Sequence, residues 1–305
     1  MDLRPAEAPC RRPAGGAVIR WVAPTDGEQE RRLLQWCEAV GPSVAVTSAE
    51  QTPDDGRPLL VVSWNMAVGA ASVAEMLAYV QRVHQIGTPA HVVMLLQEAY
   101  RSGGVPDRCP ADSRRARRLG LQRPPAGGDI LVAARALGMH AFYVPSMRNG
   151  RDCREAPFED RGNAIVSTLP LSELTAIELP LARQRRVAVS ASIRYRGRAM
   201  TVASVHFDAV RSHRPQAHAL RLSRELLKWE GPVIIGGDFN AGPFDRALAQ
   251  LGRSFREVDC GPGATHASGW RPDRMFASGL EKPPACRIAR ERAGSDHHPL
   301  VAWIE

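Results

Sequence analysis

A carboxylate and an amide stand one residue apart at the end of a strongly apolar run. Residues 232–235 (Pro-Val-Ile-Ile) lead through two glycines into Asp238, Phe239 and Asn240. Because alternate side chains of an extended chain share a face, Asp238 and Asn240 point to one side while Phe239 returns to the core. Such a pair suits a hard cation or a phosphoryl oxygen, and it would equally serve as an Asx turn that ends a buried strand.

Three other apolar runs also end in polar side chains, namely Asn65, Glu98 and His206, and the pair Asp296 and His297 stands just before the last predicted strand. Taken singly, each is as readily a strand-end cap, a satisfied core histidine or a turn residue. Together they offer complementary chemistry. Glu98 and Asn65 supply oxygen ligands for Mg²⁺ or Mn²⁺, and the two histidines supply an acid and a base. The pair at 238 and 240 would then position water and phosphate.

The chain carries an excess of positive charge. Its 305 residues have a formal net charge of +8 and a pI near 9.7, and 38 of its 40 basic residues are arginines. A GC-rich genome would produce the same arginine bias, but the basic balance favours anionic partners such as nucleic acid, lipid head groups or phosphorylated metabolites. No apolar run approaches the length of a membrane span, and residues 1–5 do not read as the start of a signal peptide.

Six cysteines are scattered along the chain, at Cys10, Cys37, Cys109, Cys153, Cys260 and Cys286. Without a C-x-x-C pair or a histidine at zinc-finger spacing, a structural zinc site is not expected, and a reduced, cytoplasmic protein is the default. If the chain is exported, Cys109 with Cys153 and Cys260 with Cys286 could each close a loop. The localisation therefore stays open.

Two regions of different character are expected. Residues 1–57 read as an N-terminal appendage that packs on the main domain, with one amphipathic helix over 28–40. Residues 58–305 form the main domain. Within it, residues 100–128 are rich in Arg, Gly and Pro and read as a surface insertion. The run Arg114–Arg118 at its centre is a solvated charged face or a patch that follows a phosphate backbone.

Apolar patterning predicts both strands and helices in the main domain. Strands are expected at 59–66, 91–96, 141–145, 163–168, 187–195, 199–207, 232–235, 275–277, 286–289 and 300–304. Helices are expected at 70–86, 129–137, 217–229 and 244–251, with a polar loop at 149–160. The turn Arg196-Gly197-Arg198 joins two strands as a hairpin. Hairpins mixed with helical crossovers indicate a mixed sheet, or two stacked sheets, flanked by helices.

The order of the motifs resembles the endonuclease/exonuclease/phosphatase superfamily. The motifs are W-N at 64–65, Q-E at 97–98, R-G-N-A-I at 161–165, V-H-F at 205–207, G-D-F-N at 237–240, an Asp before M-F at 273–276, and S-D-H at 295–297. That group includes deoxyribonuclease I, exonuclease III-type repair nucleases, neutral sphingomyelinases, inositol-polyphosphate 5-phosphatases and mRNA deadenylases. The resemblance covers residues 59–305 and is nearest to the deoxyribonuclease I branch. It implies an α/β (α+β) fold, a four-layer α/β/β/α sandwich with two packed mixed β-sheets.

The resemblance also implies metal ligands. Glu98 would be the principal ligand of Mg²⁺ or Mn²⁺, Asn65 its neighbour, and Asp296 would lie beside the metal and the phosphate. Asp238 would orient or activate the attacking water, and Asn240 would hold the phosphate.

Two histidines receive roles from the same comparison. His297 would be a base or a phosphate contact, with Asp273 orienting its ring, because a carboxylate behind a ring nitrogen fixes the tautomer. His206 matches the histidine that protonates the leaving oxygen in the deoxyribonuclease I and sphingomyelinase branches. Repair nucleases of the exonuclease III type lack it, which disfavours an abasic-site endonuclease. Asn163 would be a phosphate donor or a structural turn residue.

The sequence departs from the family pattern in two places. Pro272 and Arg274 flank Asp273, where the family usually has an aliphatic and an aromatic residue. The carboxylate expected behind His206 is not obvious, and Glu159 and Asp160 are the candidates.

The sequence thus predicts a monomeric, metal-dependent phosphodiesterase. Nucleic acid, DNA or RNA, is favoured as the substrate because of the positive charge, and cleavage would proceed by in-line attack of water. The alternatives are a phospholipid-directed enzyme, either sphingomyelinase-like or a phosphoinositide phosphatase, and a catalytically dead binding scaffold. A dead scaffold should have lost one of four residues that are all present: Glu98, His206, Asp238 and His297.

Overall fold

The computed structural model describes residues 8–24, 26–49, 55–83, 89–106, 128–149, 159–181, 184–209 and 214–304. Most of the expected insertion, including Arg114–Arg118, lies outside the described residues, as do Cys109 and Cys153. No helix in the described part is long and apolar enough to cross a membrane.

Two mixed β-sheets form the centre of the molecule. Sheet I has the order β1 (Arg20–Val22), β7 (Ser172–Glu178), β8 (Val187–Tyr195), β9 (Arg198–His206), β10 (Val233–Asp238), β12 (Asp273–Ser278) and β11 (Arg256–Glu257). Sheet II has the order β13 (Ala285–Ile288), β14 (Leu300–Ile304), β3 (Leu59–Asn65), β4 (His91–Ser102), β6 (Glu159–Ser167), β5 (His140–Arg148) and β2 (Val44–Val46). The pairs β1–β7, β9–β10 and β3–β4 are parallel, and the other pairs are antiparallel.

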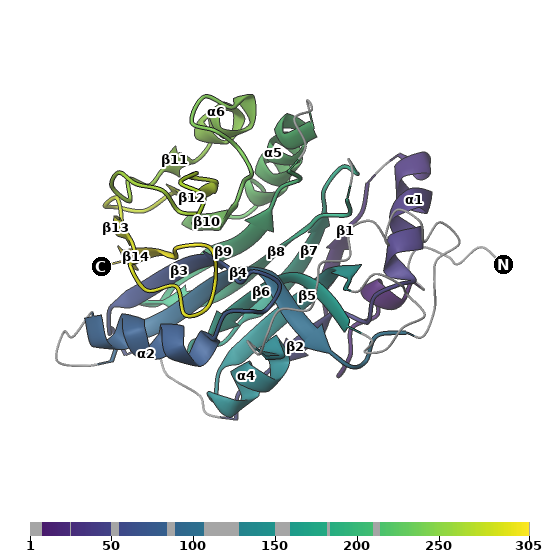
Figure 1. Ribbon diagram of the computed structural model, residues 1–305, viewed down its shortest axis with the longest axis horizontal. Helices are drawn as coiled ribbons and strands as arrows, with labels where there is room; N and C mark the ends of the chain where they lie inside the picture. The colour runs from purple at the N-terminus through teal and green to yellow at the C-terminus, as the bar shows by residue number, and fades with distance from the viewer. Residues whose placement is uncertain are drawn as a thin grey trace.

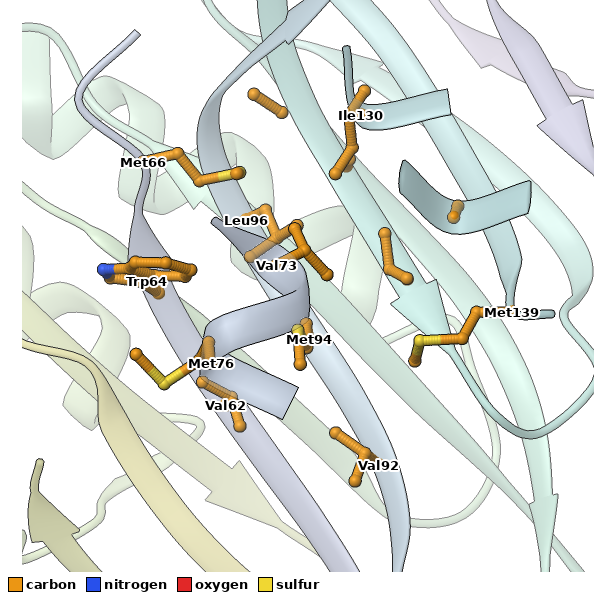
Figure 2. Close-up of a cluster of buried hydrophobic side chains, with 14 of the residues drawn as sticks. Val62, Trp64, Met66, Val73, Met76, Val92, Met94, Leu96, Ile130 and Met139 are labelled. Carbon is orange, nitrogen blue, oxygen red and sulfur yellow. The ribbon is translucent and has the colours of Figure 1, made fainter. Parts of the chain in front are cut away.

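Helices cover both outer faces of the stacked sheets. Described helices are α1 (Gly27–Cys37), α2 (Val73–Val83), α4 (Ile130–Ala136), α5 (Arg214–Leu226) and α6 (Arg246–Gly252), with a 3₁₀ turn, η2 (Pro9–Arg11). Helices α2 and α4 pack on sheet II, as Figure 2 shows for Val73, Met76 and Ile130. Helices α5 and α6 pack on sheet I (Figure 1). A third apolar cluster fills the space between the sheets, which confirms the four-layer sandwich.

Alternation along each strand decides which side chains face the space between the sheets. On β3, Val62 and Trp64 point to the helical layer while Leu59 and Val61 belong to the inter-sheet core. Because side chains alternate, Asn65 falls on the inter-sheet side.

The described part of residues 1–57 adds one edge strand to each sheet. Strand β1 pairs with β7 and strand β2 pairs with β5. A disulfide joins Cys10 to Cys37, a pairing that the sequence did not indicate, and Cys260 pairs with Cys286 as expected for an exported chain. The division at residue 57 stays a proposal, since both edge strands continue the sheets of the main domain.

Most predicted elements are present, with some exceptions. Strand β7 was not predicted because its sequence, SELTAIE, begins with polar residues and lacks a long apolar run. Strands β1, β2 and β11 have at most three residues, too few for a periodic signal. The polar loop predicted for 149–160 is wrong at its end, because β6 already begins at Glu159. The insertion predicted from residue 100 starts later, since β4 continues to Ser102.

Candidate active site

Three predicted site residues stand side by side across sheet I. Asp238 at the end of β10 is the direct partner of His206 on β9 and of Asp273 on β12. All three share the inter-sheet side of their strands, because Val202, Ile234 and Met275, spaced by even numbers from them, lie in the inter-sheet core. Strand register therefore brings together side chains that are far apart in the sequence.

A hydrogen bond connects this row to sheet II. Asn65 Nδ2 donates to Asp238 Oδ2 at 3.0 Å, while Asn65 Oδ1 accepts from the amide of Ala67 at 3.0 Å. The sheets approach closely just below, where a Cβ on Gly236 would lie 2.6 Å from Cβ of Ser63. The first glycine of the G-G-D-F-N motif thus lets the two sheets meet at the site.

His297 is held by the third member of the row. Its Nδ1 lies 2.9 Å from Asp273 Oδ2, and since an ionised carboxylate can only accept, Nδ1 carries the proton. Its Nε2 then faces Asp238 Oδ2 at 4.0 Å. Burial alone would lower the pKa of His297, but the hydrogen bond to Asp273 and the charges of Asp273, Asp238 and Asp296 raise it to about 9.

Asp238 is the common neighbour of both imidazoles. His206 Nε2 lies 3.4 Å from the same oxygen, Oδ2. Burial, with the charge of Asp273, raises the pKa of Asp238 to about 7, against the lowering effects of His297 and the amide of Asn240. Asp238, Asp273 and His297 also offer three ligand atoms within 4.8 Å of one another.

His206 lies in cationic surroundings. Burial, followed by the charges of Arg186, His297 and Arg161, holds the pKa of His206 well below the ordinary value. Arg186 is buried, and its side-chain Nε has no hydrogen-bond partner among the described residues. Arg161 donates to Asn149 Oδ1 at 3.0 Å. Sequence reasoning did not single out either arginine, although Arg161 opens the R-G-N motif and Arg186 precedes a buried strand.

Glu98 sits on a β-bulge. The pairing of β4 with β6 shifts between Leu96 and Ala99, and Glu98 has a left-handed backbone with φ of 51°. Such bulges re-aim side chains next to active sites, and a non-glycine residue with positive φ carries strain. The carboxylate accepts no hydrogen bond within the described chain. It lines a small pocket with Arg161, Arg186 and His206.

The side-chain amides of the two remaining asparagines donate hydrogen bonds to backbone carbonyls of the protein. Asn163 Nδ2 donates to the carbonyl oxygens of Val187, at 2.8 Å, and Ser204, at 3.4 Å, so it ties sheet II to sheet I. It lies within β6, not in a turn, and its donors are not free for phosphate. Asn240 donates to the carbonyl of Phe207 at 3.0 Å and is half-buried, with φ of 48°.

Asp296 is half-exposed and lies with two histidines. Its Oδ2 is 3.3 Å from His266 Nε2, and its Oδ1 is 3.9 Å from His297 Nε2. The rings of His266 and His297 meet edge to face, with centroids 4.6 Å apart. His266 was missed by sequence reasoning, because its loop has no periodic pattern. Among the described residues, Glu98 belongs to neither of the two acidic groups near His297 that could hold a metal ion.

The expected carboxylate behind His206 is neither of the two candidates from the sequence. Asp160 accepts from Arg101 Nε at 3.0 Å, from Tyr143 Oη at 2.7 Å and from the amide of Gly41 at 2.8 Å. Its carboxylate therefore serves a structural network. The carboxylate near the ring of His206 is Asp238.

Comparison with known proteins agrees with this geometry. The family model described as "Endonuclease/Exonuclease/phosphatase family" matches residues 62–297. The chain belongs to this family. It is a phosphoester hydrolase, the class of enzyme that the endonuclease/exonuclease/phosphatase family comprises. No curated protein matches the chain.

Solved structures share the endonuclease/exonuclease/phosphatase fold at low sequence identity. A family protein from Beutenbergia cavernae is 17% identical with a TM-score of 0.55, over 81% of this chain and 71% of that one. The human nocturnin catalytic domain, solved with sulfate, is 18% identical with a TM-score of 0.53, over 86% and 96%. Sphingomyelinase C from Streptomyces griseocarneus is 12% identical with a TM-score of 0.52, over 83% and 100%. At these identities the solved structures establish the fold alone.

Proposed function

We propose that this enzyme is a divalent-metal-dependent phosphodiesterase that cleaves nucleic acid. The observation that carries the proposal is the placement of two imidazoles against one carboxylate oxygen. His206 Nε2 and His297 Nε2 lie 3.4 Å and 4.0 Å from Asp238 Oδ2. Hydrolysis of a phosphodiester needs an activated water, a group that stabilises phosphoryl charge and a donor for the leaving oxygen, and these three residues supply one each.

The residues at the rim of sheet II fit a hard cation. The Glu98 carboxylate has no hydrogen-bond partner in the described chain, and it lies within β4 one residue after Gln97, the register partner of Asn65 on β3. Carboxylate and amide oxygens are the ligands that Mg²⁺ and Mn²⁺ prefer. Glu98 and Asn65 would hold the ion, and Asp296 as a further ligand stays a prediction. When bound, such an ion polarises a phosphoryl oxygen and neutralises developing charge.

The chain's own residues divide the work as follows. Asp238 orients the attacking water through Oδ2. His297 binds a phosphate oxygen through Nε2, because the Asp273 carboxylate behind it stabilises the imidazolium. His206 is the proposed proton donor to the leaving oxygen, and the negative charge of a bound phosphodiester would raise its lowered pKa towards that role. Asn240 holds this corner of the site in place through its bond to the carbonyl of Phe207.

Nucleic acid is the proposed substrate because the pocket and the whole chain are cationic. Arg161 and Arg186 are both buried beside Glu98, where a phosphodiester anion would meet them. The net charge of +8 would attract a polyanion over a longer range. A phospholipid head group presents one phosphodiester, whereas a nucleic acid presents one for every nucleotide, so the overall charge acts more strongly on the latter.

Hydrolysis of a substrate panel tests the proposal. Supercoiled plasmid, RNA, sphingomyelin and inositol polyphosphates are incubated side by side with Mg²⁺, Mn²⁺ or EDTA. DNA or RNA should be cleaved with either ion, and EDTA should abolish cleavage. Asp238→Asn and His297→Ala should each lower kcat on the order of 10³-fold.

Asp259→Asn is the matched control for the loss of a carboxylate. Asp259 is exposed and lies outside the row, so this variant should keep its activity. Turnover unaffected by EDTA would refute the proposed dependence on a divalent metal ion. Turnover confined to sphingomyelin or inositol phosphates would replace nucleic acid by the phospholipid-directed alternative, and turnover of none of the four would refute the proposed substrate class.

A further inference from the structure

The sandwich has a second opening at the end opposite the active site. A cavity of about 1050 Å³ lies there. Sheet I contributes Met200, two residues into β9, and Leu280, just after β12. Sheet II contributes Ile304, at the end of β14, and Pro58, just before β3. The strands β3, β9, β10 and β12 each carry a site residue at their other end, so a strand length separates the cavity from the catalytic row.

The floor of the cavity is the exposed end of the inter-sheet core. Met200, Tyr195 and Ile304 are buried members of that core, and Leu280 packs against it. The hydroxyl of Tyr195 donates to the carbonyl of Ile304 at 3.1 Å, so the ring, not a free hydroxyl, faces the space. Half-buried Trp303 adds a further aromatic wall. The interior is thus predominantly apolar.

The cavity stays open because the chain above it cannot extend either sheet. Residues 279–284 link β12 to β13 and end in Pro283 and Pro284. Proline has no amide donor for a β-ladder, and Gly279 has φ of 69°. The link therefore lines the cavity without pairing with either sheet.

The mouth of the cavity is basic. Among the described residues, its lining includes Arg196, Arg198, Lys282 and one carboxylate, Glu281. Arg198 Nη1 lies 2.6 Å from Glu281 Oε1 in an exposed ion pair, so the three cations keep a net positive charge at the mouth. Arg196 is exposed, has no ion-pair partner in the described part of the chain, and lies over the ring of Tyr195 with 5.3 Å from Cζ to the ring centroid. An incoming anion would meet Arg196 beside the apolar interior.

We propose that this cavity binds a single-chain amphiphile with an anionic head group, its apolar chain on the inter-sheet core and its head at Arg196 and Arg198. An apolar chain of about a dozen carbons gains on the order of 0.8 kcal/mol for each buried CH₂ group, whereas the head needs a cation at the mouth. A free phosphate or acetate lacks the first contribution and a cationic amphiphile lacks the second. The head is a carboxylate or a phosphate, and both chemistries use the same arginines.

Calorimetric titration tests the proposal on the full-length protein with EDTA present and each amphiphile below its critical micelle concentration. The probes are dodecanoate, dodecyl phosphate, dodecyltrimethylammonium, acetate and inorganic phosphate. At least one of the two anionic amphiphiles should bind with one site per chain, and the difference between them identifies the head group. The cationic amphiphile and the two small anions should bind at least tenfold more weakly. Equal binding of the cationic amphiphile, or no binding of either anionic one, would overturn the proposal.

Variants locate the binding site. The double variant Arg196→Glu and Arg198→Glu should weaken binding at least tenfold, and Leu280→Trp should block it by filling the cavity. Arg224→Glu, an exposed change on α5, is the control for charge and should bind like the parent. His206→Ala should also bind like the parent, and loss of binding in that variant would place the amphiphile in the active site instead. Unchanged binding in both cavity variants would show that the amphiphile does not bind in this cavity.

Discussion

His297 Nδ1 donates a hydrogen bond to Asp273 Oδ2 at 2.9 Å. The bond joins the ends of the two sheets and leaves Nε2 as the nitrogen that faces the substrate. Asp273 opens β12 in sheet I, whereas His297 precedes β14 in sheet II. The pair therefore also ties the two sheets together at the catalytic rim. Pro272 and Arg274, the unusual flanking residues, leave this contact intact, since Arg274 turns away to pair with Glu257 at 3.1 Å.

Asp273→Asn should leave the fold intact while it weakens the hold on the His297 ring. The amide keeps the size of the side chain but removes the negative charge, so the pKa of His297 should fall from about 9 towards the ordinary value near 6.5. We expect kcat to fall on the order of 10²-fold or more. NMR titration of the His297 ring measures the pKa. A ring that titrates unchanged in this variant would contradict the assigned contact.

Stability should fall as the pH rises through neutrality. The folded pKa of Asp238 is raised to about 7 and that of His297 to about 9. Both groups hold a proton in the folded state that the unfolded chain has already lost. Their contribution is therefore complete below the unfolded pKa values and is lost between about pH 4 and 7 for Asp238 and about pH 6.5 and 9 for His297.

Urea unfolding in EDTA between pH 5 and 9 measures this dependence. We expect the free energy of unfolding to fall on the order of 3 kcal/mol between pH 6.5 and 9, since the lowered pKa of His206 opposes the fall only below pH 6.5. Asp273→Asn should flatten the part above pH 6.5, because it removes the cause of the raised pKa of His297. A free energy of unfolding that rises between pH 7 and 9 would contradict the raised pKa values.

His266 should act as a positioning residue for the rim. The amide of Ser268 donates to His266 Nδ1 at 3.1 Å, so in the neutral ring Nε2 carries the proton and donates to Asp296. His266→Ala should lower kcat about tenfold with little change in KM, and His266→Gln, which keeps a donor, should recover part of it. Steady-state kinetics on the preferred substrate measures both. Equal losses in the two variants would mean that the ring only fills space.

Gly162→Ala should damage the fold next to Glu98. A Cβ on Gly162 would lie 1.9 Å from the carbonyl oxygen of Val144 and 2.7 Å from Cα of Pro145, both of them backbone atoms. We expect a loss of about 3 kcal/mol in the free energy of unfolding. Gly252→Ala, where nothing lies within 4 Å of the added carbon, should be neutral or slightly stabilising. Equal unfolding midpoints for the two variants would contradict the packing.

The disulfides should make the protein sensitive to reduction. The Cys260–Cys286 bond closes a loop of 26 residues, which corresponds to about 3 kcal/mol of stabilisation. The Cys10–Cys37 bond ties η2 to the end of α1. Disulfide bonds persist in oxidising compartments, so the two bonds fit the exported alternative that the sequence left open beside the reduced default. The unfolding temperatures measured with and without dithiothreitol should differ by several degrees. Identical unfolding curves would mean that neither disulfide stabilises the fold.

The sequence predicted the fold class and most of the row of candidate site residues. The alternation of side chains along a strand is a local property. It already predicts that Asn65, His206 and Asp238 each lie on the same face of their strand as its alternate residues. The order of the motifs then identified the family and the four-layer sandwich. His297 was predicted from the S-D-H motif and Asp273 from the M-F motif that follows it.

Other features depended on contacts that no local pattern encodes. The bulge at Glu98 and the amide of Asn163 depend on how β4, β6 and β9 are registered, and the candidate carboxylates Glu159 and Asp160 were wrong for the same reason. His266 approaches His297 only through loop closure.

The sequence by itself determined which residue types stand at the strand ends, because side-chain direction along a strand is set within a few residues. Only the tertiary structure decided which of them share a hydrogen bond, since the pairings between Asn65 and Asp238, and between Cys10 and Cys37, join segments whose distance is fixed by sheet stacking. The open end of the sandwich is likewise a result of packing, because it depends on where β12 stops relative to β14.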